Sequence, residues 1–346
     1  MRIFHTMETH ISNIHIQNFK SIKDLKLQAN RVNVFIGEPN TGKSNILEAL
    51  SVFSINAMDS GFKQLIRFKS TGNLFYDSVL DKPISIKTNV QSFKLEYKKN
   101  DNGALMNQFA GLFYQKEEDL LKKTNSNHDR PSFDMRHDGT IINNYGANFQ
   151  THVVTYIYKR LEKFEQTFRP FLNPPYGDNI PNLLLSSSEY KKMVSNFFRD
   201  KGYKINLKPE DNDMEIAKEE DEIIYSYPYM TISETLQRIV FMMLAIETNK
   251  NSTLILDEPE SNTFPFYTKY VAERIAQDKS NQYFITTHNP YLLMNIIEKT
   301  PSKELNIYIT KMKNYQTKAH LLSKADLKEV VRMQHDVFFN LDKFAK

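Results

Sequence analysis

The chain has 346 residues, which at about 150 residues per domain favours two domains. Hydrophobic residues make up 40% of the chain and cysteine is absent, so a disordered chain, disulfides, thiolate nucleophiles and cysteine-ligated zinc sites are excluded. The net charge of +4 is small, and it permits a local basic patch without requiring nucleic acid as a partner.

The sequence gives no sign of a membrane or secretory segment. The N-terminal residues MRIFHTMETH contain no apolar core of a signal peptide, and no run approaches the ~18 apolar residues of a membrane span. The longest apolar stretch, Ile239 to Ile246, is typical of a buried helix. We therefore expect a cytoplasmic protein with no membrane partner.

The first elements indicate a strand pair followed by a buried strand. Ile11 to Phe19 alternates apolar and polar residues, as half-buried strands do, and Leu25 to Leu27 is predicted to be its short partner. Val32 to Ile36 is a continuous apolar run that suits a strand of a parallel sheet, buried on both faces. A glycine loop follows, and Ser44 to Phe53 has helical spacing.

The middle of the chain is less regular. Residues 160–202 are predicted to be helical, broken by a turn at Pro174 to Gly177, and the acidic run Glu219 to Glu222 is predicted to be a solvated turn. The predicted strands on either side of the helical region are Ile84 to Thr88, Phe93 to Tyr97, Val153 to Tyr158, Lys204 to Lys208 and Met214 to Ala217.

The last third alternates helices and strands, which favours an α/β sheet. A closing helix is predicted from Ser323, where Ser323 and Asp326 form a capping-box pattern. The elements before it are a helix over about 233–248, a strand Thr253 to Leu256, a helix over about 266–277, a strand Gln282 to Ile285, a helix, and a hairpin Asn306 to Leu322.

A phosphate-binding loop is predicted between the buried strand and the first helix. The pattern G-x-x-x-x-G-K-[ST] is matched in full by Gly37, Glu38, Pro39, Asn40, Thr41, Gly42, Lys43 and Ser44. Backbone N–H groups of such a loop surround phosphates, Lys43 reaches the β- and γ-phosphates, and Ser44 offers a hydroxyl to Mg²⁺. A glycine turn that precedes a lysine by chance is the alternative, and the flanking strand and helix count against it.

An acidic pair and a histidine follow two later strands. The strand Thr253 to Leu256 ends in Asp257 and Glu258, where Asp257 would hold Mg²⁺ and Glu258 would accept a proton from the attacking water. The strand Gln282 to Ile285 runs into a loop that carries His288, which would contact the γ-phosphate and stabilise developing charge. The predicted catalytic residues are therefore Lys43, Glu258 and His288, and the predicted metal ligands are Ser44 and Asp257.

Taken in order, these segments resemble the ABC-type ATPase heads of the SMC, RecF and OLD group, in its AAA15/AAA21-like branch. The similar segments are the N-terminal strand pair ISNIHIQNFKSIKDLKL, the Walker A segment GEPNTGKSNILEAL, the Walker B segment LILDEPES and the switch-histidine segment TTHNPYLL. The resemblance covers residues 9–60 and 225–300 well and residues 60–220 poorly.

The resemblance implies a fold and a domain arrangement. The fold is α/β: a P-loop ABC-ATPase head with an antiparallel β lobe, a mostly parallel core sheet flanked by helices, and a small helical and β insertion. Residues 1–160 and 222–346 would form the head, and residues 161–221 would form the insertion, as a lid or a partner-binding surface. The cofactors would be ATP and Mg²⁺, with Asn45 added to the nucleotide-binding residues.

The resemblance also implies a signature loop, S-x-G-x-x-R or LSGGQ, that completes the site of a second ATP-bound head. Ser233 and Arg238 fit this pattern, whereas the two glycine positions carry Glu234 and Thr235. A hydroxyl and N–H groups at a helix N-terminus suit a γ-phosphate, and Ser233 with the amide of Thr235 can supply them. The alternative is a simple capping box between Thr231 and Glu234.

Two further features of the family have only partial matches. After Glu258, Pro259 and Glu260, a Leu-His pair of relatives is absent, so contacts across a dimer are expected to differ. The glutamine that couples Mg²⁺ to the lobe interface has two candidates, Gln64 and Gln91.

Three functions remain open. The first is an ATP-hydrolysing sensor or motor subunit, as in anti-phage defence, that forms a homodimer or higher homo-oligomer and acts with a separate nuclease or toxin, or on double-stranded DNA. The second is a RecF-like DNA repair ATPase. The third is a nucleotide-gated scaffold with little turnover. Residues 60–225 show no sustained heptads, which excludes a coiled-coil arm, and the residues after His288 carry no evident nuclease domain.

Overall fold

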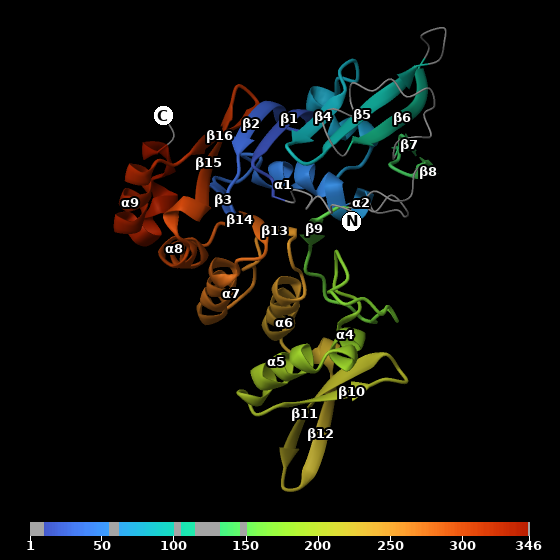
Figure 1. Ribbon diagram of the computed structural model, residues 1–346, viewed down its shortest axis with the longest axis vertical. Coiled ribbons are helices and arrows are strands. Elements are labelled where there is room, and N and C mark those ends of the chain that lie inside the picture. The colour runs from blue at the N-terminus through green and yellow to red at the C-terminus, as the bar shows by residue number, and fades with distance from the viewer. Residues whose placement is uncertain (1–9, 55–61, 100–104, 115–131, 146–150, 345–346) are drawn as a thin grey trace, which may run out of the picture.

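The computed structural model describes residues 10–54, 62–99, 105–114, 132–145 and 151–344. Within these ranges, helix α1 (Lys43–Ser51) lies between an antiparallel β lobe and a mostly parallel core sheet, and a smaller unit of helices and strands lies at the far end (Figure 1). The predicted α/β head is thereby confirmed. No helix in the described ranges is long and apolar enough to cross a membrane.

The core sheet has the strand order β16-β15-β3-β14-β13-β9. Neighbours from β15 to β9 run parallel, and β16 runs antiparallel to β15. Strand β3 is buried along its whole length, because both faces of the sheet are covered. The bounds are β3 (Val32–Gly37), β9 (Val153–Tyr156), β13 (Thr253–Asp257), β14 (Gln282–Thr286), β15 (Leu305–Lys313) and β16 (Gln316–Leu321).

Helices cover one face of this sheet and α1 covers the other. The predicted buried run Ile239 to Ile246 lies in α6, which packs on the core sheet and on the far unit at once. Helix α9 begins with the predicted capping box, since Ser323 Oγ accepts from Asp326 N at 3.2 Å and Ser323 N donates to Asp326 Oδ2 at 2.8 Å. These helices are α6 (Glu234–Glu247), α7 (Pro265–Gln277), α8 (Pro290–Lys299) and α9 (Lys324–Met333).

The antiparallel lobe has the strand order β2-β1-β4-β5-β6-β7-β8. Ile14 and Ile16 of β1 point into the core that the lobe shares with α1, as their alternation predicts. The short helix α2 (Phe62–Leu65) packs into the same core. The strands are β1 (Asn13–Phe19), β2 (Ile22–Gln28), β4 (Ile84–Thr88), β5 (Ser92–Lys99), β6 (Leu105–Tyr114), β7 (Ser132–Arg136) and β8 (Ile141–Tyr145).

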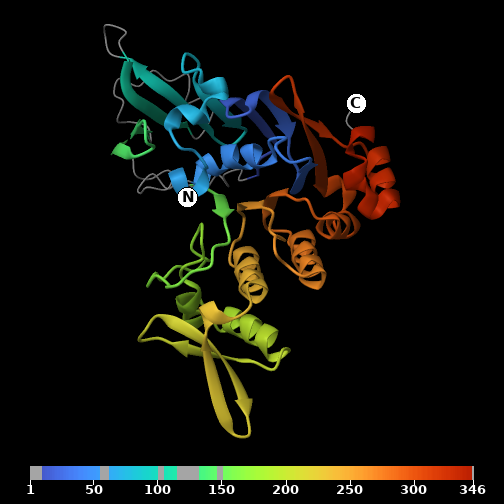
Figure 2. The same cartoon turned by 180° about the vertical axis from the view of Figure 1, so that it is seen from behind.

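The far unit contains two helices and a three-stranded antiparallel sheet, which Figure 2 shows from behind. Its apolar residues, such as Leu183 and Phe198, join the same core as α6. The elements are α4 (Ile180–Ser186), α5 (Ser188–Arg199), β10 (Lys204–Lys208), β11 (Asp213–Glu220) and β12 (Ile223–Pro228).

Two predictions for this region are wrong in part. Residues 160–179 are not helical, because prolines such as Pro174 and Pro175 lack the amide that a helix needs and the chain folds back through loop contacts such as Ile157 N to Pro175 O at 2.9 Å. The predicted acidic turn is confined to Asp221 and Glu222, since Glu219 and Glu220 belong to β11.

Candidate nucleotide-binding site

The loop between β3 and α1 has backbone conformations that glycine and asparagine tolerate. Gly42 has φ of 92°, and a side chain there would place Cβ 1.9 Å from Thr317 Oγ1. Asn40 also lies in the left-handed region, with φ of 62°. Thr41 Oγ1 lies 2.7 Å from Thr310 Oγ1, so the β15–β16 hairpin supports the loop from behind.

The predicted lysine folds over this loop. Lys43 Nζ donates to the carbonyl oxygens of Gly37 at 3.0 Å and Glu38 at 2.8 Å. Burial lowers the pKa of Lys43, and the carboxylates of Glu258 and Asp257 oppose that shift. Pro39 is exposed on the rim of the loop, between Glu38 and Asn40.

Two predicted residues at the start of α1 point in different directions. Ser44 Oγ donates to Asp257 Oδ1 at 3.2 Å, across the carboxyl ends of the strands. Asn45 instead donates through Nδ2 to Ser21 Oγ at 2.7 Å, and so holds the turn between β1 and β2. Asn45 thus connects the loop to the lobe.

A hydroxyl and a carboxylate therefore meet where a hard cation would bind. Thr286 Oγ1 donates to the same oxygen of Asp257 that Ser44 contacts. Mg²⁺ favours such oxygen donors and commonly takes only one or two from protein when phosphates supply others. The residues present fit that requirement, and within the described ranges no group of three or more His, Cys, Asp or Glu competes as a metal site.

Glu258 and His288 join Lys43, Ser44 and Asp257 in a row of side chains that follows the ends of three adjacent strands, β3, β14 and β13. Strand β14 lies between β3 and β13, so the loop that carries His288 emerges between the P-loop and the acidic pair. His288 Nε2 lies 3.5 Å from Glu258 Oε1, and both side chains are about 40% exposed. Burial lowers the pKa of His288, Lys43 lowers it further, and Glu258 and Asp257 oppose the shift. Glu258 is held through N–H donation to Thr286 Oγ1 at 3.1 Å.

A cavity of about 390 Å³ adjoins this row. Gln64 lines it beside Ser44 and Asp257, whereas Gln91 lies in the turn between β4 and β5 and accepts and donates there with Thr88. Of the two glutamine candidates, Gln64 is therefore the one placed beside the predicted metal ligands.

Charged residues that no motif indicated surround the same cavity. Glu48 of α1 is buried and ion-paired to Lys20 and, at 2.7 Å, to Arg67. Burial lowers the pKa of Lys20, and Glu48 opposes the shift. Sequence reasoning missed Glu48, Arg67 and Thr286, because their roles depend on contacts between segments distant in the chain.

The predicted signature residues separate into two groups. Ser233 is exposed at the N-terminus of α6, and Thr235 Oγ1 donates to the carbonyl of Asn262 at 3.1 Å, next to the segment after Glu258. Arg238 stacks on the ring of Tyr158 at 4.2 Å and lines the cavity of its own chain. That placement differs from the partner-facing role that the resemblance implies for Arg238.

The alternative capping box between Thr231 and Glu234 does not form. Thr231 Oγ1 donates to the carbonyl of Pro228 at 2.7 Å, and Glu234 instead accepts from Arg238 at 3.0 Å. The turn before Ser233 is fixed by Gln237, whose Nε2 donates to the carbonyl oxygens of Ile232 and Met230.

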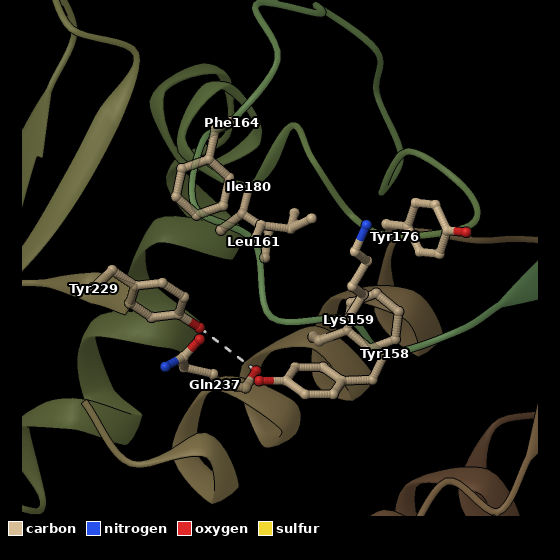
Figure 3. A pocket seen from close by; sticks show the side chains of 9 residues that line it. Tyr158, Lys159, Leu161, Phe164, Tyr176, Ile180, Tyr229 and Gln237 are labelled. Atoms are coloured by element: carbon tan, nitrogen blue, oxygen red, sulfur yellow. Dashed lines mark hydrogen bonds between the residues drawn. The ribbon is translucent and has the colours of Figure 1, made fainter. Parts of the chain in front are cut away.

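A small pocket shows how this turn is anchored (Figure 3). Tyr229 donates through its hydroxyl to the carbonyl of Gln237 at 3.5 Å, and the ring of Phe164 packs on Tyr229 at 6.1 Å between centroids. The pocket has room of about 20 Å³, which suits one water molecule. It is therefore a packing contact between α6 and the far unit.

Comparisons with known proteins agree with this geometry. Residues 32–295, more than half of the chain, match the AAA_21 family model, described as "AAA domain, putative AbiEii toxin, Type IV TA system". A crystal structure of the SmcHead bound to the C-winged helix domain of ScpA is similar with a TM-score of 0.52 and 13% identity, covering 92% of this chain and 99% of that one. At that identity the similarity concerns the fold alone.

Two curated relatives match over part of their length. The uncharacterised protein MJECL10 of Methanocaldococcus jannaschii is 34% identical over 28% of this chain and 50% of the relative. The DNA replication and repair protein RecF of Clostridium tetani is 24% identical over 63% of this chain and 60% of the relative. The chain thus spans about half to three fifths of these relatives.

Proposed function

Because this chain belongs to the AAA_21 family and is a P-loop ATPase of the SMC, RecF and AAA superfamily, we propose that it binds ATP with Mg²⁺ at Gly37 to Ser44 and hydrolyses it. The observation that carries this proposal is the 3.2 Å contact between Ser44 and Asp257, with Glu258 and His288 beside it. These groups converge from three neighbouring strand ends, as a hydrolytic site for a triphosphate requires.

Each residue of the row has a proposed task. Lys43 would exchange its bonds to loop carbonyls for the β- and γ-phosphates. Ser44 and Asp257 would hold Mg²⁺, which would neutralise phosphate charge. Glu258 accepts a proton from the attacking water. His288, whose pKa burial lowers in the nucleotide-free chain, offers a ring N–H to the γ-phosphate.

A second copy would complete the site through Ser233 and the amide of Thr235. In support, Ser233 is exposed at a helix N-terminus, where anions bind favourably. The charge of Glu234, which occupies a glycine position, is paired with Arg238 at 3.0 Å within the chain. We therefore propose that ATP-bound heads form a homodimer despite the altered signature.

The hydrolysis proposal is tested with two substitutions in the chain, alone and with its natural companion protein. We expect Lys43→Ala to abolish magnesium-dependent ATP affinity, and Glu258→Gln to retain affinity while lowering turnover by about 100-fold or more. Glu210→Gln, on the exposed turn before β11, serves as the matched control. Unchanged ATP affinity in Lys43→Ala would refute the assignment.

We further propose that the chain is the sensor or motor subunit of an anti-phage complex with a separate nuclease or toxin as effector. The family description names a toxin of toxin–antitoxin systems, and the similar SMC head binds a partner domain. Residues 161–221 are the proposed partner-specific insertion, with residues 1–160 and 222–346 as the head. Purification with ATP and Mg²⁺ should retain an effector encoded beside this gene, and a chain that purifies without one would contradict this role.

Two other functions have specific support. The RecF match favours a DNA repair ATPase, which requires ATP-dependent, salt-sensitive binding to duplex DNA, so an absence of binding at low salt would remove it. The residues Glu234 and Thr235 at the glycine positions favour a scaffold with little turnover. A Glu258→Gln variant equal to the wild type in turnover and in assembly lifetime would support that scaffold.

A further inference from the structure

Among the described residues, no strand pairs with the outer edge of β12 in the far unit. It is the outer strand of the sheet β10-β11-β12, and each of its six residues is exposed, with Ile224 at 65%. Figures 1 and 2 both show the β11–β12 hairpin projecting past α5. Exposed apolar edge strands readily pair with another strand, because their N–H and C=O groups lie in a row.

Apart from Pro228 at its end, which has no N–H to donate, β12 lacks the features that usually block pairing. The sequence of β12, IIYSYP, has no charged residue, and its register with β11 runs without a shift from Glu220 opposite Ile223 to Glu215 opposite Pro228. Strand β10 at the other edge carries Lys204 and Lys208. Charged residues of that kind discourage edge pairing, so β12 is the edge that favours a new strand.

The apolar character of β12 continues the core of the unit. Directly opposite residues of antiparallel strands share a face, and Tyr227 lies opposite Ile216, which is buried. Tyr225, on the same face, lies opposite Lys218, whose ammonium sits 5.3 Å from its ring. A strand added beside β12 would therefore extend a face that already packs on α5.

Charge at the two ends of β12 indicates which strand would pair with it. At one end lies the turn of Asp221 and Glu222, since the preceding acids Glu219 and Glu220 are ion-paired to Lys204 and Lys218. At the other end lies the exposed Arg160, whose guanidinium donates to the carbonyl of Met230. An antiparallel copy of the same strand places the acidic end of each chain beside Arg160 of the other, and does so twice by symmetry.

Two registers of such a pair are possible. When two copies of one strand pair about a twofold axis, a residue at the centre lies opposite its own copy, because hydrogen-bonded and non-hydrogen-bonded pairs alternate along the strands. An axis at Tyr225 or at Ser226 keeps the paired residues within β12, which ends at Pro228. In either register the turn at Asp221 and Glu222 of one copy lies toward the end of β12 that leads to Met230 of the other, whose carbonyl Arg160 contacts.

We propose that β12 is a self-association edge, through which two copies of this chain pair antiparallel into one continuous sheet. The contact includes no residue of the nucleotide site, so it forms without ATP and is separate from the proposed head dimer. Cross-strand contacts among Ile224, Tyr225 and Tyr227 of the two copies would stabilise it.

The absence of cysteine permits a direct test by oxidative cross-linking. Opposite Cα atoms in an antiparallel pair lie about 4.5–5.5 Å apart, which is within the range of a disulfide. In the full-length chain without nucleotide, we expect Tyr225→Cys or Ser226→Cys to form a disulfide-linked dimer. Asn206→Cys, at the middle of β10, is the matched control and should remain unlinked.

Sedimentation without nucleotide supplies an independent readout. Ile224→Lys should weaken the dimer at least tenfold. Arg160→Glu should also weaken it, and adding Glu222→Arg should restore it. Lys43→Ala should dimerise like the wild type, which separates this edge from the ATP-dependent contact. The inference is overturned by a wild-type chain that stays monomeric, by unchanged dimers of Ile224→Lys, or by occupation of β12 by a strand of another protein.

Discussion

Glu260 couples stability to pH in a way that can be calculated. It is 4% exposed, one carboxyl oxygen accepts from Thr287 Oγ1, and the other has no hydrogen-bond partner within the described residues. Burial raises the pKa of Glu260 from 4.5 to about 7. The folded chain therefore binds more protons than the unfolded chain between pH 4.5 and 7, so stability falls as pH rises through that window. At about 1.36 kcal/mol per pKa unit, the raised pKa lowers the free energy of unfolding above pH 7 by about 3 kcal/mol.

We expect Glu260→Gln to remove this cost, because glutamine has the same shape and keeps an acceptor for Thr287. Without nucleotide, the free energy of unfolding of the variant should exceed that of the wild type by up to about 3 kcal/mol at pH 8. This difference should become smaller toward pH 5. Urea unfolding at pH 5, 6, 7 and 8 measures it, with the exposed Glu210→Gln as the control for lost charge. A gap that is constant across pH, or that widens toward acid, would refute the reasoning.

Three other outcomes follow from named contacts. Gly42→Ala should lose ATP affinity and about 1–3 kcal/mol of unfolding free energy, because its φ of 92° and the nearby Thr317 exclude a side chain; a variant with wild-type urea midpoint would count against this. Asp257→Asn should make ATP affinity independent of Mg²⁺ in calorimetry, and a retained magnesium response would exclude Asp257 as a ligand. Arg31→Met should cost about 3 kcal/mol in unfolding, because Arg31 is buried and donates to the last carbonyls of α7; a loss within 0.5 kcal/mol, about the scatter of surface substitutions, would contradict it.

The sequence predicted the parts of the site that are encoded locally. The P-loop and the strand ending at Asp257 are short patterns whose residue types follow from phosphate and metal chemistry, and the superfamily resemblance drawn from them is confirmed by the family match and the head fold. The sequence predicts His288 beside the acidic pair, whereas its position between that pair and the P-loop follows from the strand order β3-β14-β13 of the structure.

Other features depended on information that local patterns lack. Glu48 and Arg67 meet only because α2 packs beside α1, which no spacing reveals. Residues 160–179 have enough apolar residues for a helix, yet prolines and loop contacts prevent one. Strand β12 escaped prediction because neither face is buried, so its apolar residues do not alternate.

Thr286 gives the site a mechanical property. Its one hydroxyl donates to the carboxylate of Asp257 and accepts from the amide of Glu258, while the same strand leads to His288. The proposed cation ligand and the proposed base are therefore linked through a single atom, and the strand that carries this atom leads to His288. Replacing threonine with valine would leave the shape but remove the link between Asp257 and Glu258.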